Sequence, residues 1–358
     1  MRTVFITGAS GLVGGRLISK YQSKNINVIC LVHRESLDKH YAGLPNVRIV
    51  LGDIYRRDLG MNSVDQEFIK KEVTDMWHCA AKTDFSISAQ EGEEVNVIGT
   101  KNFLDFASQC KQVRRIGVLS TLYISGKMTG VIEERMIEHS EGFVNEYERS
   151  KYLMEQVVKE RMQSLPIAMY RISTAIGDAK TGEILRHNAV HQAIRLLYGG
   201  LAPMIPAHEL TRMNFISDDH AADSLYYLFE ERFTAGKVHH IAAKNDDMPS
   251  VAEFLGNTFL LFAQLDPEWQ RRNIEIPPIV STDSFALFKQ TVEKTENSML
   301  MRIFDMMDHF VPQLSYPKTF DMSDTARMLE QGGIYATPFN AYYPLIVRQC
   351  LKSKKKLK

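Results

Sequence analysis

Short apolar runs alternate with amphipathic stretches along the first half of the chain. Strand-like runs occur at residues 3–6, 27–32, 47–51, 75–79, 115–120 and 167–172. Helix-like patterns separate them, for example at residues 16–21, 96–109 and 147–161. Because strands that alternate with helices form parallel sheets covered on both faces, this pattern predicts an α/β fold with a doubly wound parallel sheet.

The alternation loosens after about residue 178, where methionines, aromatic residues and prolines become frequent. Strand-like runs return at residues 213–216 and 237–241. We therefore expect three parts. The first is a core formed by residues 1–178, to which residues 213–245 return. The second is a smaller, mainly helical region of residues 179–212 and 246–345, and the third is a basic tail of residues 346–358. The Met-rich stretch 299–310 is more typical of a packed core than of a lipid pocket.

Composition narrows the classes of protein that the chain can belong to. The 358 residues carry no net charge, and no basic face suggests nucleic acid as a partner. Four scattered cysteines lack the spacing of a disulfide framework or a metal site, which fits the reducing cytoplasm. We expect neither a signal peptide nor a transmembrane segment. The lysine-rich end is either a solvated tail or a contact for anionic lipid.

A glycine-rich turn follows the first strand. It consists of Thr7, Gly8, Ala9, Ser10, Gly11, Leu12, Val13 and Gly14, and a helical pattern begins directly after it. Gly8 permits a tight turn, Gly11 lets the backbone approach a pyrophosphate, and Gly14 lets the helix pack on the strand. The free N–H groups of the helix then face an anion. An ordinary turn of small residues is the alternative, but the strand–turn–helix context favours a dinucleotide site built from Thr7, Gly8, Ser10, Gly11, Leu12, Val13 and Gly14.

The end of the second strand bears on the choice of cofactor. NAD sites usually carry a carboxylate there, which holds the ribose 2′-hydroxyl. This chain has His33 and Arg34 instead, and a guanidinium can pair with a 2′-phosphate. The residues favour NADP(H), with Arg34 as the phosphate ligand and His33 beside it. NAD(H), with Arg34 as an ordinary loop residue, is the alternative.

Tyr147 and Lys151 lie four residues apart in a helical pattern, so they share one helix face. A lysine beside a phenol stabilises the phenolate and is expected to lower the pKa of the tyrosine. Taken alone, such a pair is more often a solvated helix face.

Together these residues resemble the extended short-chain dehydrogenase/reductases, which implies a Rossmann-type fold. Further motifs fall in the family's order. The resemblance implies that the cofactor is also bound by Asp53 and Ile54 beside the adenine, by Ala80, Ala81 and Lys82 after the fourth strand, and by Asn96 in an Asn-x-x-Gly-Thr helix. It also implies that Thr121 is the active-site hydroxyl. It implies that Thr121, Tyr147 and Lys151 form a catalytic triad in which Lys151 also holds the nicotinamide ribose. Lys82 is alternatively a plain loop residue.

The chain is also similar to the thioester reductase and fatty acyl-CoA reductase branch of that family. The similarity lies in Ser-Thr-Leu-Tyr-Ile-Ser-Gly at 120–126, in the Tyr147 segment and in residues 214–222. It implies NADPH-dependent reduction of an acyl thioester, bound to CoA or a carrier protein, to an aldehyde or alcohol without a metal. A ketone or hydroxyl oxidoreductase, a sugar-nucleotide epimerase or dehydratase, and a non-catalytic NADP-binding regulator are the alternatives. Homodimers are common in the family.

Overall fold

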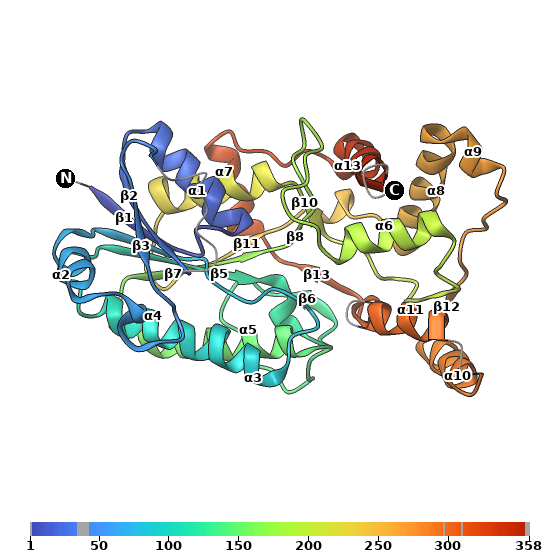
Figure 1. The fold of residues 1–358 in the computed structure, drawn as a ribbon, viewed down its shortest axis with the longest axis horizontal. Coiled ribbons are helices and arrows are strands. Elements are labelled where there is room, and N and C mark those ends of the chain that lie inside the picture. Colours follow the sequence, from blue (N-terminus) through green and yellow to red (C-terminus); the bar gives the residue numbers. More distant parts are fainter. Residues whose placement is uncertain (1, 34–42, 296–297, 309–310, 355–358) are drawn as a thin grey trace.

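The computed structural model describes residues 2–33, 43–295, 298–308 and 311–354 (Figure 1). Its largest element is a seven-stranded sheet in which every pair of neighbours is parallel. In spatial order the strands are β3 (Val47–Leu51), β2 (Asn27–Val32), β1 (Thr3–Thr7), β4 (Asp75–His78), β5 (Arg115–Thr121), β7 (Ile167–Ile172) and β11 (Val238–Ile241). This is the doubly wound parallel sheet that the alternating pattern predicts, and it is a Rossmann-type fold.

Helices cover both faces of the sheet (Figure 1). On one face lie α1 (Leu12–Ser23), α7 (Asp218–Glu231) and α12 (Ser323–Gln331); on the other lie α2 (Ser63–Glu72), α4 (Gly99–Ala107) and α5 (Glu146–Arg161). Successive strand residues point to opposite faces. In β1, Val4 and Ile6 accordingly join the core with α1, whereas Phe5 joins the core with α4 and α5. Most strand positions are apolar, because both faces of most of these strands are buried.

The order of the strands reverses between β1 and β4. The chain moves outward from β1 to β3 and then returns to place β4 on the other side of β1. At such a switch point the carboxyl ends of the strands leave a crevice, in which open α/β sheets bind their ligands. Gly8 and Cys79 directly follow β1 and β4, so the glycine-rich turn lies at this crevice.

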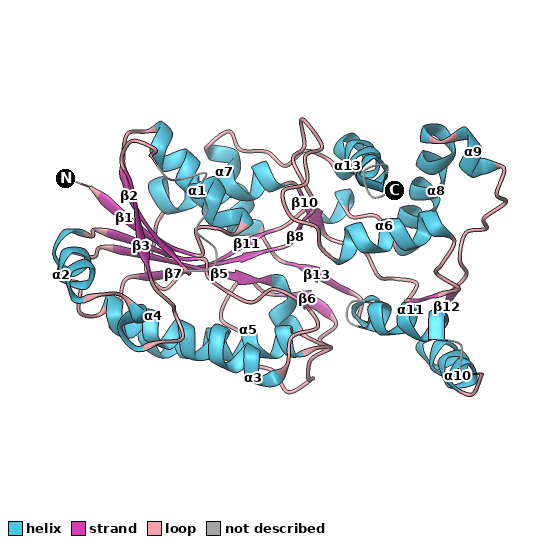
Figure 2. Cartoon of the chain, in the orientation of Figure 1, coloured by secondary structure: helices cyan, strands magenta, loops and turns pink. Residues whose placement is uncertain are grey.

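The second half of the chain builds a mainly helical region at one end of the sheet (Figure 2). Its helices are α6 (Ala189–Gly199), α8 (Val251–Leu265), α9 (Pro267–Gln270), α10 (Thr282–Glu293), α11 (Ser298–Asp308) and α13 (Phe339–Lys354). Short parallel pairs join β8 (Thr174–Ala175) to β10 (Phe215–Ile216), β9 (Ile205–Pro206) to β12 (Ile279–Val280), and β6 (Gly130–Ile132) to β13 (Lys318–Phe320). This region has an apolar core of its own, in which Phe254, Phe262 and Tyr343 are buried.

Two elements differ from the expected boundaries. The helix expected at 96–109 starts and ends earlier, because the short α3 (Ala89–Glu91) leads into a π-helix over Gly92–Ile98 and then into α4, which ends at Ala107. The tail expected to begin at residue 346 begins later, because α13 continues to Lys354 and buries Ile346, Val347 and Cys350 completely. These apolar residues lie on the inner face of α13. In the sequence, the lysines that follow them are typical of a polar tail and obscure this apolar face.

In the part of the chain that the structure describes, no helix is both long and apolar enough to cross a bilayer. All four cysteines are free thiols.

Candidate active site

Three buried side chains meet where β5 ends and α5 begins. Thr121 is the last residue of β5, Tyr147 lies in the first turn of α5, and Lys151 lies one turn further along. They are 5%, 7% and 5% exposed, respectively. The hydroxyl groups of Thr121 and Tyr147 are hydrogen-bonded to each other. The structure therefore brings together the three residues that the sequence proposes as a triad.

The protonation of Tyr147 differs from the expectation. Burial raises the pKa of the Tyr147 hydroxyl, and the hydrogen bond with Thr121 only partly opposes this effect. Lys151 is not among the groups that shift this pKa; its Nζ instead donates to the carbonyl oxygen of Leu119 at 3.0 Å. The expectation that Lys151 lowers the pKa of Tyr147 is therefore wrong. A protonated phenol at neutral pH can donate a proton, as a reduction requires.

A buried ion pair lies near the Lys151 side chain. Burial lowers the pKa of Lys151 to about 8, and the nearby Glu155 carboxylate acts in the opposite direction. Glu155 pairs with Arg171 at 2.6 Å, and both side chains are almost completely excluded from solvent. Ser120 also donates to Glu155 at 2.6 Å. Glu155 thus joins α5 to Ser120 of β5 and to Arg171 of β7. These contacts hold the helix that carries Lys151.

Two positions of the glycine-rich turn, Gly8 and Gly14, have no room for a side chain. Gly8 has φ +71°, and a Cβ there would lie 2.5 Å from the backbone nitrogen of Ala80. A Cβ at Gly14 would collide with the carbonyl oxygen of Gly8. Gly11 precedes α1 and provides no side-chain cap, so the first N–H groups of α1 stay available to a ligand. This cradle fits the pyrophosphate of a nicotinamide dinucleotide.

The strand ends beside the turn are held by a short chain of hydrogen bonds. Thr7 Oγ1 lies 2.9 Å from His78 Nδ1, and Thr100 Oγ1 lies 2.9 Å from His78 Nε2. Burial, and secondarily the Lys151 charge, lowers the pKa of His78 to about 3, so this ring is neutral. The neutral ring, held between two hydroxyl groups, ends β4 and has no acid–base role. Ala80 and Ala81 follow it at the edge of the crevice.

Asn96 links the loop after β4 to the catalytic helix. Its Oδ1 accepts from the backbone nitrogen of Lys82 at 2.8 Å, and its Nδ2 donates to Lys82 O at 3.1 Å and to Ser150 Oγ at 2.8 Å. Ser150 in turn donates to the carbonyl oxygen of Tyr147 at 2.8 Å. These contacts occupy the Asn96 amide, which favours a positioning role over the direct cofactor contact that the sequence suggests.

The residues expected near the adenosine end are only partly within the described chain. Asp53 follows β3 and lies 3.0 Å from His33 Nε2. Ile54 is buried against Gly99, where an added Cβ would lie 2.8 Å from the Ile54 side chain. Arg34, the proposed 2′-phosphate ligand, lies outside the described residues.

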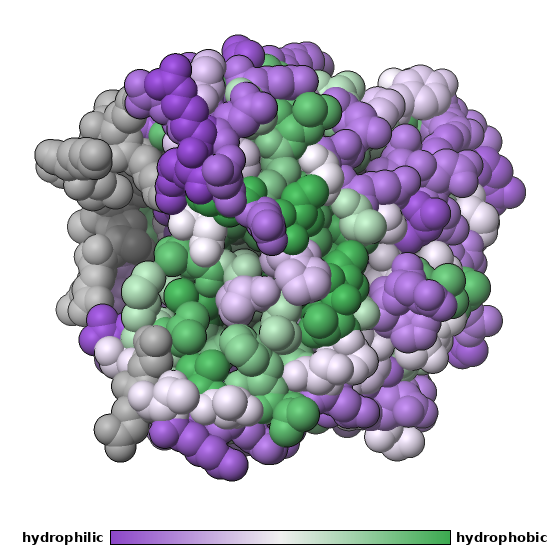
Figure 3. Space-filling view, turned by 90° about the vertical axis from the view of Figure 1, so that its right-hand side faces the viewer, coloured by the Kyte–Doolittle hydropathy of each residue, from purple (hydrophilic) through white to green (hydrophobic). Residues whose placement is uncertain are grey.

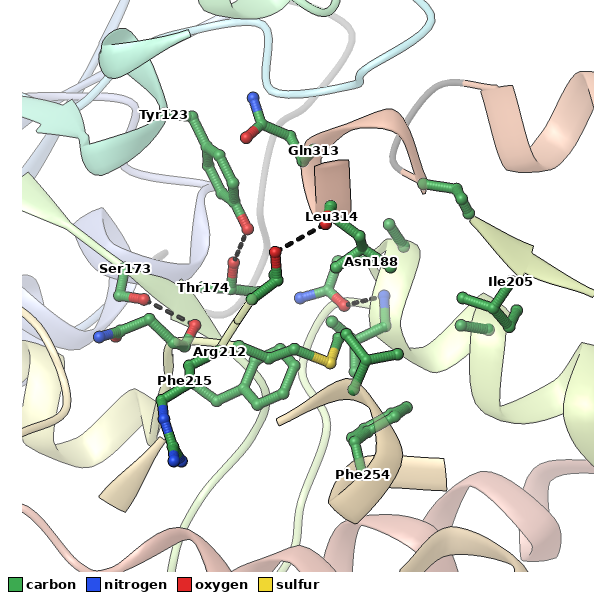
Figure 4. Close-up of a pocket in the computed structure, with 18 of the residues that line it drawn as sticks. Tyr123, Ser173, Thr174, Asn188, Ile205, Arg212, Phe215, Phe254, Gln313 and Leu314 are labelled. Carbon is green, nitrogen blue, oxygen red and sulfur yellow. Dashed lines mark hydrogen bonds between the residues drawn. The ribbon is translucent and has the colours of Figure 1, made fainter. Parts of the chain in front are cut away.

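A large apolar cavity adjoins the triad (Figure 4). The Phe85 ring lies 5.4 Å from the Tyr147 ring and 5.7 Å from the Tyr123 ring, and both Phe85 and Tyr123 line the cavity. The opposite walls come from α6, α8, α11 and β10, which contribute Leu196, Leu197, Phe254, Leu255, Met307 and Phe215. The space between the lining residues, including the part open to solvent, is about 1340 Å³. Figure 3 shows the mainly helical region's side of the molecule, where apolar side chains gather around a hollow.

A polar cluster that the sequence analysis missed connects this cavity to the catalytic helix. Glu148 is completely buried, accepts from Val144 N at 2.9 Å, and also accepts from the side chain of Gln313. Lys318 Nζ lies 3.4 Å from Gln313 Oε1 and also donates to Gly126 O. Gln313 and Lys318 line the cavity, whereas Glu148 lies behind them. No local pattern could reveal this cluster, because more than 160 residues separate Glu148 from Gln313.

Comparison with known proteins decides the family. The sequence model of the male sterility protein family, an NAD-binding family, matches residues 6–225, which include the glycine-rich turn and the triad. The chain belongs to the male sterility protein family. The matched family is NAD-binding, which agrees with the dinucleotide cradle at the glycine-rich turn.

The similar proteins include two relatives in sequence and one solved structure. The fatty acyl-CoA reductase wat of Drosophila melanogaster is 25% identical in an alignment over 215 residues that covers 47% of this chain and 42% of that protein. The non-canonical nonribosomal peptide synthetase cpsA of Aspergillus campestris is 23% identical in an alignment over 279 residues that covers 69% of this chain and 26% of that protein. The chain thus spans less than half the length of these two relatives. The structure of the terminal R domain from the myxalamid PKS-NRPS pathway shares the fold, with a TM-score of 0.77 at 19% identity over 100% of this chain and 92% of that one.

Proposed function

We propose that the protein reduces an acyl thioester with NADPH, releasing an aldehyde that a second turnover converts to an alcohol. The observation that carries this proposal is the apolar cavity, which reaches the triad through Phe85 and Tyr123. An acyl chain gains free energy from burial in such a lining, at about 25 cal/mol per Å² of apolar surface. The relatives that act on fatty acyl-CoA or belong to peptide synthetases support the thioester class.

The residues of the chain then have defined roles. When bound, the reduced nicotinamide supplies a hydride to the thioester carbonyl carbon. Tyr147 donates its hydroxyl proton to the carbonyl oxygen, and Thr121 donates a hydrogen bond to the same oxygen. Lys151 leaves the Leu119 carbonyl and holds the nicotinamide ribose. The resulting thiohemiacetal loses its thiol by cleavage of the C–S bond, which gives the aldehyde.

The choice of NADPH over NADH rests on His33 and Arg34, at the end of β2, where a carboxylate would repel a 2′-phosphate. A ratio of the two affinities tests it. We expect the dissociation constant of NADPH to be at least tenfold below that of NADH, and Arg34→Ala to remove the difference.

The test of the substrate class is consumption of NADPH by the purified protein with acyl-CoA thioesters of graded length, with the products identified by mass spectrometry. We expect turnover that depends on chain length and yields aldehyde or alcohol. Ketones and UDP-sugars serve as comparison substrates, because they represent the other enzyme classes that use this fold. Turnover of those compounds without turnover of any thioester would replace the proposal with one of the alternatives.

A further inference from the structure

A second cavity lies behind the apolar cavity, at the carboxyl end of α6. It is lined by that end of the helix, by Phe259 of α8, and by the segment 273–277. Among the described residues, Leu197 and Ala202 are the only two that line both cavities. Leu197 is 3% exposed and belongs to the core of the mainly helical region. The Leu197 side chain therefore lies between the two cavities, and we call it the partition.

Helix α6 runs away from the triad. At its start, Asn188 donates to the carbonyl oxygen of Ala175 at 2.8 Å, beside the Thr174 hydroxyl to which Tyr123 is hydrogen-bonded. Because an α-helix rises about 1.5 Å per residue, Leu197 lies roughly 13 Å further along the cavity wall than Asn188. The partition therefore stands at the end of the cavity that is remote from Tyr123.

The backbone around the partition is held firmly. Helix α6 ends in a turn in which Gly200 has φ +68° and donates to Leu197 O at 3.0 Å, which returns the chain so that Ala202 lies beside Leu197. Trp269 Nε1 donates to Tyr198 O at 2.7 Å, and Ile205 N donates to Pro278 O at 2.9 Å. These bonds hold the backbone on both sides of the second cavity.

We propose that Leu197, with Ala202 beside it, closes the remote end of the acyl site and sets the longest acyl chain that the enzyme accepts. This inference rests on the proposed thioester reduction. A chain whose last methylene meets Leu197 fits, whereas a longer chain must displace a packed side chain. Truncation of Leu197 joins the two cavities, and the end of a longer chain then passes toward Phe259.

The experiment measures kcat/KM and calorimetric affinity for saturated acyl-CoA thioesters of increasing length. The variants are Leu197→Ala, Ala202→Leu, and the control Leu196→Ala. Leu196 is the adjacent leucine of α6 and lines the first cavity alone. We expect Leu197→Ala to raise kcat/KM about tenfold or more for the first chains that are too long for the wild type. Leu196→Ala is expected to keep the wild-type limit, and Ala202→Leu to shorten it.

An unchanged length limit in both Leu197→Ala and Ala202→Leu would overturn the inference, although the proposed function would stand. If Leu197→Ala fails to fold, as shown by its thermal melting, Ala202→Leu decides alone. If the wild type binds acyl-CoA without reducing it, the proposed function fails. The role of Leu197 is then tested by the acyl chain length at which the calorimetric affinity stops rising, compared between the wild type and the variants. Absence of any acyl-CoA binding to the wild type would overturn both.

Discussion

Asn96 donates a hydrogen bond from its side-chain amide to Ser150 Oγ at 2.8 Å, and so joins the loop after β4 to the helix that carries Tyr147 and Lys151. Asn96 is only 1% exposed. The same amide binds both backbone polar groups of Lys82, at the edge of the dinucleotide crevice. One buried side chain thus sets the spacing between the cofactor loop and Tyr147.

Replacement of Asn96 by alanine is expected to reduce kcat about tenfold or more, because small displacements of positioned groups are costly in catalysis. It also leaves buried polar partners unsatisfied, which lowers the free energy of unfolding by about 1–3 kcal/mol. Steady-state kinetics and chemical denaturation measure the two effects. The matched control is Asn102→Ala, which removes a single bond of 3.0 Å to Ile54 O from the same region of helix. Equal losses of kcat in the two variants would refute the positioning role.

Glu148 is expected to make stability fall as pH rises. Burial raises its pKa from 4.5 to about 7, so between these values the folded protein keeps a proton that the unfolded chain has lost. The free energy of unfolding therefore decreases with pH across this window. Glu148→Gln should flatten the dependence and stabilise the protein by about 1–3 kcal/mol at pH 8.

Denaturation curves between pH 5 and pH 8, roughly the range over which such a shift acts, test the Glu148 prediction. Glu146→Gln is the control, because Glu146 lies on the same helix with a side chain that is 41% exposed. A Glu148→Gln variant with the wild-type slope would show that the buried carboxylate does not titrate in this window.

Two helical glycines should respond in opposite ways to alanine. A Cβ at Gly14 collides with the Gly8 carbonyl oxygen, whereas a Cβ at Gly256 in α8 meets nothing within 4 Å. Gly14→Ala is expected to lower the melting temperature and weaken NADPH binding at least tenfold. Gly256→Ala should stabilise the protein by about 0.5–1 kcal/mol, because alanine has the higher helix propensity. Unimpaired NADPH binding by Gly14→Ala would contradict the proposed cradle.

The sequence contained enough information for the Rossmann core, because its signals are local. The period of apolar residues identifies the strands, and the motifs around Gly8 and Tyr147 mark the crevice that the structure forms from β1, β4 and β5. The raised pKa of Tyr147 could not be predicted, since it follows from burial of the hydroxyl among segments that are distant in the sequence, such as that of Phe85. The Glu148–Gln313–Lys318 cluster and the Leu197 partition depend on contacts between distant segments, which no local pattern reports. The inner face of α13 was hidden by the lysines that follow it.

The most direct test of the account compares wild type, Tyr147→Phe and Tyr152→Phe with an acyl-CoA and NADPH deuterated at the transferred position. Tyr152 lies on the same helix and packs on His139 and Phe143 instead of the triad. We predict that the wild type and Tyr152→Phe yield aldehyde or alcohol with deuterium on the former thioester carbon. Tyr147→Phe should be slower by about a hundredfold or more, while it still binds NADPH. Wild-type turnover by Tyr147→Phe, or a product without deuterium, would contradict hydride transfer with Tyr147 as the proton donor.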